Sequence, residues 1–347
     1  MKKYFSSAIC SKGYISSYHT IYKNDPSAKV FIANTCDDFE RATFFNQLVK
    51  NFRGFNLELF NPFFDESLDG VYIENTNTYI ISDGGYNKIH PILLGAWEKP
   101  INISSDKNYL LDLRREIIAL KIKENNFYKK GCEHLKTASK TRERIHETVS
   151  PYLNDRKVIN FISRFCLRNF RDTKERGNGK MRLLASPTPL GIHTHFDTLF
   201  DNVEKVIEIQ DTWGFAGSVI IGVLKDYAIR EKIPFIVCPS YFGGDIPSTI
   251  IFPTASICVI ITDENRILPF EPYEKINAMR FLNSEYIECD EKLQSLLSAE
   301  NTFLDKCVFS LFNGRDARFK IADLTKGYCD SEKAKEDADK LTEKILN

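Results

Sequence analysis

The sequence has no CxxC pair, no apolar run approaching about 20 residues and no excess of either charge. Its nine cysteines are odd in number and scattered, which favours reduced thiols in a cytoplasm over a disulfide framework or a zinc site. Lys plus Arg and Asp plus Glu both total 47, so there is no clear nucleic-acid signal. The missing apolar run argues against a signal peptide and a membrane partner. The sequence therefore predicts a cytoplasmic protein.

The composition is that of a folded chain with a large core, since 43% of the 347 residues are hydrophobic and 27% are charged. At roughly 100–200 residues per domain, the length favours two domains. An internal repeat supports this division, because the same order of apolar runs, turns and acidic ends occurs twice. The matching segments are 5–22 with 183–200, 57–73 with 235–251 and 79–83 with 259–263, at offsets of 178, 178 and 180. We interpret them as diverged copies of one domain.

Each copy alternates short runs of β-branched and aromatic residues with stretches of helix length, a pattern typical of α/β folds with mostly parallel sheets. A strand at 29–34 leads into a helix at about 37–51, where Asp37 and Glu40 can form a capping box. In the second copy a strand at 203–210 leads into a helix at 217–231.

The segment between the copies has a different character. Apolar residues at three- and four-residue spacing predict a helical insertion at about 105–150, either as two helices broken near Gly131 or as one long bent helix. The polar run 171–180 is the candidate linker. A charged amphipathic helix is expected at 331–347.

The turns between strand and helix are the candidate binding sites, because amides at a helix N-terminus bind anions. The second copy reads Asp211-Thr212-Trp213-Gly214-Phe215-Ala216-Gly217-Ser218. Compared with a GxxxxGK[ST] loop, Ser218 holds the magnesium-ligand position, Gly217 replaces the lysine and Asp211 replaces the first glycine. Asp263 ends an apolar run and corresponds to a Walker-B carboxylate. Nucleotide binding through Gly214, Gly217 and Ser218 and a plain structural turn remain alternatives.

The first copy has no glycine in this turn. Its sequence is Thr35-Cys36-Asp37-Asp38-Phe39-Glu40-Arg41-Ala42, with Arg41 where the lysine would be. The acidic residues Asp37, Asp38 and Glu40 would repel a triphosphate at the position where a positive field is needed. Arg41 can reach an anion, although surface exposure is the simpler expectation.

The chain resembles a family of uncharacterised bacterial proteins built from two P-loop ATPase-like halves and often described only as ATP-binding. The resemblance covers roughly residues 3–320. The segments that carry it are Lys12-Gly13, Ser67-Leu68-Asp69-Gly70-Val71, Ser82-Asp83-Gly84, His90-Pro91, the helical stretch after Asp106 and Ala185-Ser186-Pro187-Thr188-Pro189-Leu190-Gly191. Each half of that family typically carries an intact GxxGxGKST-like loop, and this sequence departs from that pattern in both halves.

The resemblance implies an α/β chain of two tandem P-loop-NTPase-like three-layer domains, with mostly parallel sheets and helical insertions. The expected boundaries are 1–170 for the first domain, 181–330 for the second and 331–347 for the C-terminal helix. It implies ATP or another nucleotide with Mg²⁺ as ligand. The candidate binding residues are Gly214, Gly217, Ser218, Asp263 and Arg41.

Two further motifs suggest other chemistry. His193 and His195 resemble the HxH pair of metal-dependent hydrolases, but no further histidine follows them in the chain. Cys238 ends an apolar run where a nucleophile can lie, and a buried cysteine is the simpler interpretation.

Taken together, these patterns predict a degenerate ATPase-like protein with a nucleotide-binding or interaction role and weak or absent hydrolysis. The missing lysines and glycines leave its status as an enzyme open and its catalytic residues unassigned. The alternatives are a scaffold protein without ligand and a metal-dependent hydrolase using His193 and His195. The identity of a protein partner does not follow from the sequence.

Overall fold

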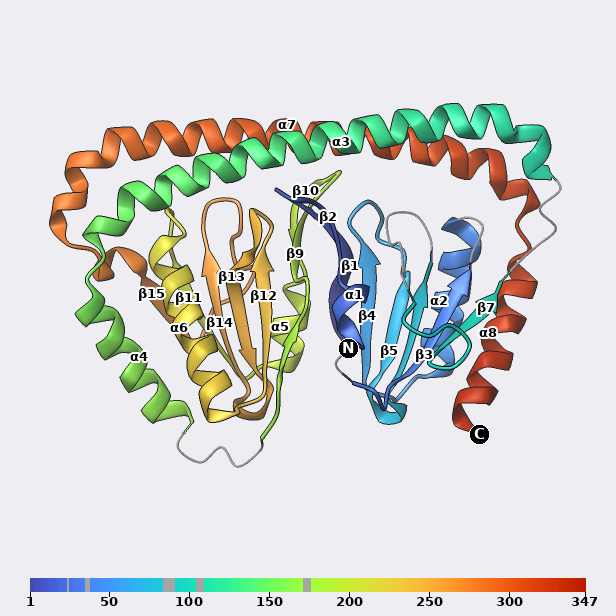
Figure 1. Cartoon of the computed structure of the whole chain (residues 1–347), viewed down its shortest axis with the longest axis horizontal. Coiled ribbons are helices and arrows are strands. Elements are labelled where there is room, and N and C mark those ends of the chain that lie inside the picture. The colour runs from blue at the N-terminus through green and yellow to red at the C-terminus, as the bar shows by residue number, and fades with distance from the viewer. Residues whose placement is uncertain (24, 35–37, 84–90, 104–108, 171–175) are drawn as a thin grey trace.

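The computed structural model describes residues 1–23, 25–34, 38–83, 91–103, 109–170 and 176–347. Two α/β halves stand side by side beneath a pair of long helices that spans both of them (Figure 1). Turn residues 35–37, with the Asp37 of the expected capping box, lie outside the described residues. So do Gly84 and His90 and the 171–175 part of the expected linker.

The first half contains a seven-stranded sheet of order β2-β1-β4-β5-β6-β3-β7. Its elements are β1 (Lys2–Cys10), β2 (Gly13–Ser16), α1 (Tyr18–Ile21), β3 (Lys29–Asn34), α2 (Asp38–Asn51), β4 (Leu57–Pro62), β5 (Gly70–Ile73), β6 (Thr78–Ser82) and β7 (Glu98–Asn102). In β3, Val30 and Ile32 point into one core cluster while Phe31 and Ala33 point into another. Both faces of this strand are therefore buried, which explains its unbroken apolar run.

The second half contains a six-stranded sheet of order β15-β11-β14-β13-β12-β8 and a separate two-stranded sheet of β9 and β10. Its elements are β8 (Gly179–Met181), β9 (Ala185–Thr188), β10 (Gly191–Thr194), α5 (Asp197–Asn202), β11 (Lys205–Gln210), α6 (Phe215–Glu231), β12 (Phe235–Ser240), β13 (Gly243–Phe252), β14 (Ile257–Thr262) and β15 (Glu274–Asn277). Strand β8 lies inside and just beyond the expected linker 171–180.

Both large sheets are mixed, so the expectation of mostly parallel sheets is wrong. Strands β3 and β11 each lie between two parallel neighbours, but β4, β5 and β6 form an antiparallel meander, as do β12, β13 and β14. Short turns join the meander strands, and short turns can connect only antiparallel neighbours. One such turn places Asn77 at φ 47°, and the corresponding turn places Ser256 at φ 52°.

The two halves share a core. One cluster combines Tyr4, Phe60 and Tyr79 of the first half with Ile236 and Ile260 of the second. The outer face of the first sheet packs against α2 and the C-terminal helix α8 (Ser331–Leu346), while α6 and α4 (Asp155–Asn169) cover the second sheet. The inner faces of the sheets therefore pack toward each other at the junction (Figure 1).

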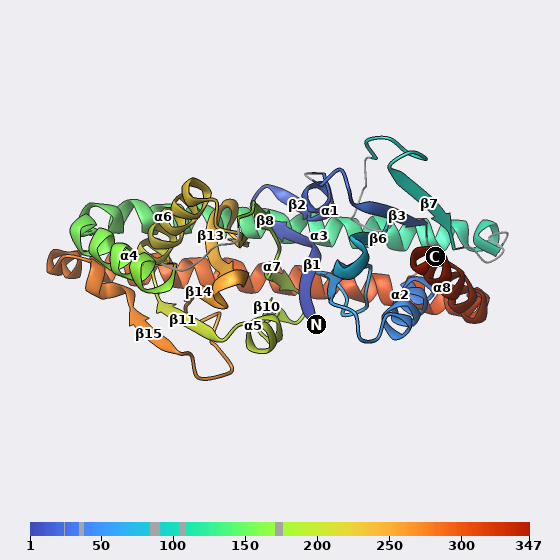
Figure 2. The same cartoon turned by 90° about the horizontal axis from the view of Figure 1, so that it is seen from below.

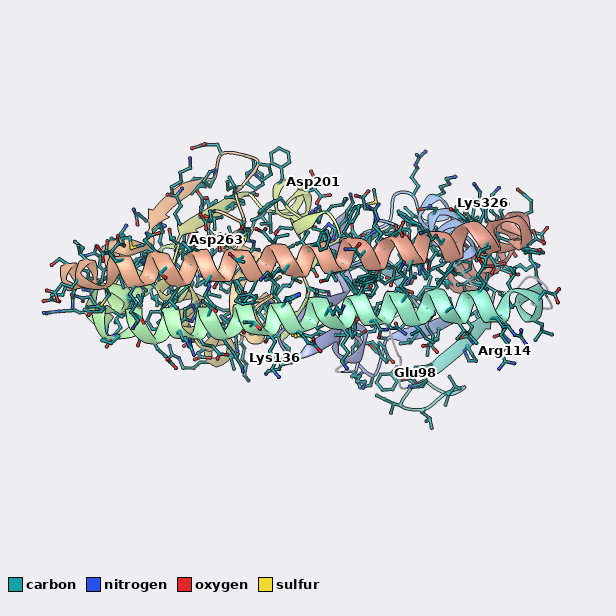
Figure 3. All side chains as sticks on the ribbon, turned by 90° about the horizontal axis from the view of Figure 1, so that it is seen from above. Glu98, Arg114, Lys136, Asp201, Asp263 and Lys326 are labelled. Atoms are coloured by element: carbon teal, nitrogen blue, oxygen red, sulfur yellow. The ribbon has the colours of Figure 1, made fainter. Side chains whose placement is uncertain are left out.

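Helices α3 (Tyr109–Val149) and α7 (Asp290–Thr325) lie side by side along the whole molecule (Figures 2 and 3). Of the two alternatives left open by the sequence, α3 is a single helix. At Gly131 an added Cβ would lie 3.1 Å from Leu311 of α7, so this glycine allows close contact rather than breaking the helix. The remaining short 3₁₀ segments are Glu74–Thr76, Ser150–Tyr152, Pro253–Ala255, Ala278–Phe281, Ser284–Cys289 and Lys326–Tyr328.

No helix in the described part of the chain combines the length and apolar character needed to cross a membrane.

Candidate functional site

The N-terminus of α6 is closed by a side chain of the protein itself. The Asp211 carboxylate accepts hydrogen bonds from the backbone N–H of Gly214 at 3.0 Å and of Gly217 at 2.7 Å. Asp211 is 2% exposed, and burial raises its pKa above the ordinary value. Amides at a helix N-terminus bind anions, and here the bound anion is internal.

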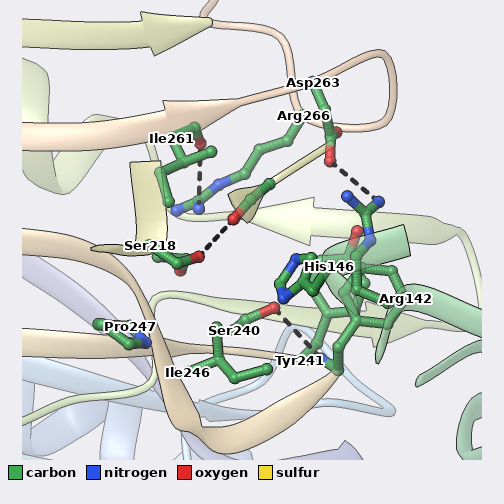
Figure 4. A pocket seen from close by; sticks show the side chains of 13 residues that line it. Arg142, His146, Ser218, Ser240, Tyr241, Ile246, Pro247, Ile261, Asp263 and Arg266 are labelled. Atoms are coloured by element: carbon green, nitrogen blue, oxygen red, sulfur yellow. Dashed lines mark hydrogen bonds and ion pairs between the residues drawn. The ribbon is translucent and has the colours of Figure 1, made fainter. Parts of the chain in front are cut away.

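The structure brings Gly214, Ser218 and Asp263 to one small pocket (Figure 4). The Ser218 hydroxyl donates to the carbonyl of Gly214, and the Asp263 carboxylate accepts from the backbone N–H of Asn265 at 2.9 Å. Gly217 does not line this pocket, because its amide faces Asp211. The candidate residues of the second half are therefore neighbours, and Ser218 and Asp263 already have internal hydrogen bonds.

Arg142 of α3 is a member of this site that sequence reasoning missed. Its guanidinium donates to the carbonyl of Thr212 at 3.2 Å and forms a two-point ion pair with Glu300 of α7, at 2.7 and 2.5 Å. Asp263 lies 3.9 Å away (Figure 4). Burial lowers the pKa of Arg142, but the Glu300 carboxylate outweighs burial and raises it. The apolar spacing in the sequence predicts the helix that carries Arg142, but not its contact with this turn.

Gly214 is required at this position for two reasons. Its φ of +68° lies in the left-handed region, and an added Cβ would lie 2.9 Å from Nη1 of Arg142. The glycine therefore serves the packing of Arg142 as well as the turn.

The pocket itself is small. Its cavity of about 40 Å³ can hold only a few water molecules, since one water needs at least roughly 10–15 Å³. Arg266, on another wall, donates to the Thr249 hydroxyl at 2.9 Å. In this conformation the space beside α6 does not accommodate a nucleotide.

Arg41 lies in the other half and is not a surface side chain. It is 3% exposed, and its guanidinium contacts Asp38 at 2.6 Å, Asp65 at 3.5 Å and the Ser67 hydroxyl at 2.9 Å. Arg318 of α7 also pairs with Asp38, at 2.5 Å. The charge of Arg41 is thus matched inside the protein, and Arg41 is separate from the pocket beside α6.

His193 and His195 lie on and next to β10, with their ring centroids 4.9 Å apart. Among the described residues, no group of three or more His, Cys, Asp or Glu side chains can hold a metal ion. The nearby Asp197 is paired with Lys3 at 2.9 Å. Nε2 of His195 is buried and has no hydrogen-bond partner in the described structure. Cys238 is fully buried, and burial raises the pKa of its thiol to about 12, so it is a poor nucleophile.

Two buried imidazoles should make stability depend on pH. Burial lowers the pKa of His195 to about 3, with His193 adding to the effect, and burial lowers that of His146 to about 4, with Arg142 adding to it. Each is neutral when folded, whereas the unfolded chain takes up a proton below about pH 6.5, so stability is lost as pH falls from about 6.5 toward these values.

We expect each histidine to contribute a loss of about 2 kcal/mol between pH 7.5 and pH 5. Urea unfolding of His195→Gln and of wild type at both pH values measures this loss. An unchanged pH dependence in the variant would contradict the assignment.

No protein-family model, curated protein or solved structure matches the chain.

Proposed function

We propose that this chain is an interaction protein built from two ATPase-like halves, with weak or no nucleotide hydrolysis. The single observation that carries the proposal is the Asp211 carboxylate bound by the amides of Gly214 and Gly217. These are the amides that the sequence assigns to a phosphate.

Electrostatics support this proposal. A phosphate at the α6 N-terminus would have to displace Asp211 or approach it closely, and like charges at short range repel strongly in a buried site. Arg142, the cation nearest to the turn, is already neutralised by Glu300. Gly217 stands where a P-loop has its lysine. Arg266 also lines the pocket, but its guanidinium already donates to the Thr249 hydroxyl and to the carbonyl of Ile261.

The arrangement of elements supports an origin from two copies of one α/β unit. Each half runs through a hairpin, a short helix, a strand, a helix, a three-strand meander, an edge strand and a long helix. The ion pairs between the long helices show the same repeat. Glu124 of α3 pairs with Arg318 of α7, and Arg142 of α3 pairs with Glu300 of α7. The two glutamates are 176 residues apart in the sequence, and so are the two arginines.

The long helices also support an interaction role. Leu111, Ile118 and Ile122 of α3 are exposed, at spacings that place them on one face of that helix. Phe309, Phe312 and Phe319 of α7 are exposed as well. Large apolar side chains gathered on exposed elements mark interaction surfaces.

Thermal unfolding with and without Mg-ATP and Mg-GTP tests the proposal. A nucleotide-binding protein gains about 2.7 kcal/mol at a hundredfold excess over its dissociation constant. We expect no stabilisation of the wild-type protein. The variant Asp211→Gly frees the two amides without enlarging the pocket enough for a nucleotide, so we expect inorganic phosphate to stabilise it more than it stabilises the conservative variant Asp211→Asn. Stabilisation of the wild type by either Mg-nucleotide would overturn the proposal in favour of a nucleotide-binding role.

A further inference from the structure

A second and much larger cleft lies between the halves. Its volume is about 730 Å³, and it shares no lining residue with the pocket beside α6. The walls come from β1, α2, β4 and the segment after it, the residues 188–197, Pro269 and α7. Small-molecule sites typically have volumes of about 300–1,000 Å³ and often lie where two structural units meet.

The walls of this cleft are largely aromatic and aliphatic. Leu190, Ile192 and Phe196 line it with accessible surface. Phe5, Phe63 and Phe64 also line it, but only 1–3% of each is exposed. Phe5 contacts His195, with ring centroids 4.4 Å apart and the ring planes tilted by 40°. Because burial keeps the pKa of His195 near 3, this ring is neutral and adds to the apolar wall. Such walls favour the flat or branched apolar body of a ligand.

The charged groups of the cleft are matched, with two exceptions. Lys3 pairs with Asp197, and Asp65 pairs with Arg41. Arg315 of α7 has no ion pair with any described residue; its guanidinium lies over the Phe319 ring at 4.6 Å. Glu66 likewise has no ion pair with a described residue, and its side chain is exposed to solvent. The half-buried guanidinium is therefore the group in this cleft that an anionic ligand can satisfy.

The acidic side chains near Arg315 favour a singly charged anion over a doubly charged one. Asp65, Glu66 and Asp197 line the same cleft, so a dianion such as a phosphate monoester would be repelled. A carboxylate carries one charge and matches the two-point geometry of a guanidinium.

We propose that this cleft binds a small monocarboxylate with an aromatic or branched apolar body, its carboxylate held by Arg315 and its body packed against Leu190, Ile192 and Phe196. This site is independent of the proposed interaction role and of the turn before α6.

Isothermal titration with 4-phenylbutanoate, compared with the neutral 4-phenylbutanamide, tests this proposal. We expect saturable binding of the acid and affinity at least about tenfold weaker for the amide, since a charge-assisted contact is lost. Arg315→Met should weaken binding of the acid by about the same factor and leave binding of the amide unchanged. The exposed Arg230→Met serves as the matched control and should bind like wild type.

A second variant tests the location of the site. His193 is exposed and lines the cleft, so His193→Trp should fold and block binding of both compounds. Equal affinities for acid and amide, an unchanged affinity in Arg315→Met or His193→Trp, or no saturable binding of 4-phenylbutanoate would each overturn the proposal. None of these results bears on nucleotide binding beside α6.

Discussion

Replacing Arg182 by methionine should destabilise the protein by roughly 3–5 kcal/mol, because the change strands a carboxylate in the core. The Arg182 guanidinium contacts Glu58 of β4 at 2.8 Å, and the two side chains are 1% and 2% exposed. The pair joins the two halves, since Arg182 follows β8 and Glu58 lies in the first sheet. Urea unfolding at neutral pH measures the loss.

The double variant Arg182→Met/Glu58→Leu should recover most of that stability, since replacing a buried ion pair by apolar residues is often neutral or stabilising. As a matched control, Arg168→Met removes an exposed arginine that pairs with Glu274, and should change stability by no more than about 0.5 kcal/mol. Equal losses in the single and double variants would mean that the stranded charge is not the cause.

The α/β class and many individual elements could be predicted from the sequence. The expected strand at 29–34 is β3, and the expected helix at 217–231 differs from α6 by two residues at its start. These elements are predictable because both faces of the central strands are buried, so each one appears as a continuous apolar run bounded by turns.

The direction of the strands could not be predicted in the same way. The run at 57–73 contains β4 and β5, which are antiparallel, but its composition is like that of parallel strands because both faces are buried. The spacing of apolar residues shows which faces of a strand are buried, but not whether the strand runs parallel or antiparallel to its neighbours. The short turns indicate antiparallel neighbours, whereas the alternation of strand-like runs with stretches of helix length favours parallel ones.

The candidate site was predictable only in part. Gly214, Ser218 and Asp263 do converge, because the start of helix α6 lies beside the end of β14. The role of Asp211 was missed, since comparison with a phosphate loop treated it as a replaced glycine and not as the anion itself. Arg142 is about 70 residues distant in sequence from the turn that it contacts, and no local pattern reports such a contact.

Arg142→Met is the second substitution with a large expected effect, again roughly 3–5 kcal/mol at neutral pH. Arg142 is the two-point partner of Glu300, which is fully buried on α7, and it also holds the carbonyl of Thr212. Its loss should therefore both separate the long helices and loosen the turn before α6. Amide hydrogen exchange at Gly214 and Gly217 should become faster in this variant.

The pH dependence of this variant identifies the cause of its instability. Burial already raises the pKa of Glu300, and without the guanidinium that pKa should rise further, so the folded variant binds a proton that the unfolded chain releases. Its stability should then fall as pH rises, and the deficit relative to wild type should be smaller at pH 5 than at pH 8. Because Arg142 also helps to lower the pKa of His146, its loss acts in the same direction below about pH 6.5, so the comparison is made in a His146→Gln background. The exposed neighbour Arg144→Met is the control for a lost positive charge on α3. If the deficit of Arg142→Met were the same at both pH values, or if Arg144→Met showed the same deficit, the buried pair would not be what holds α3, α7 and the α6 turn together.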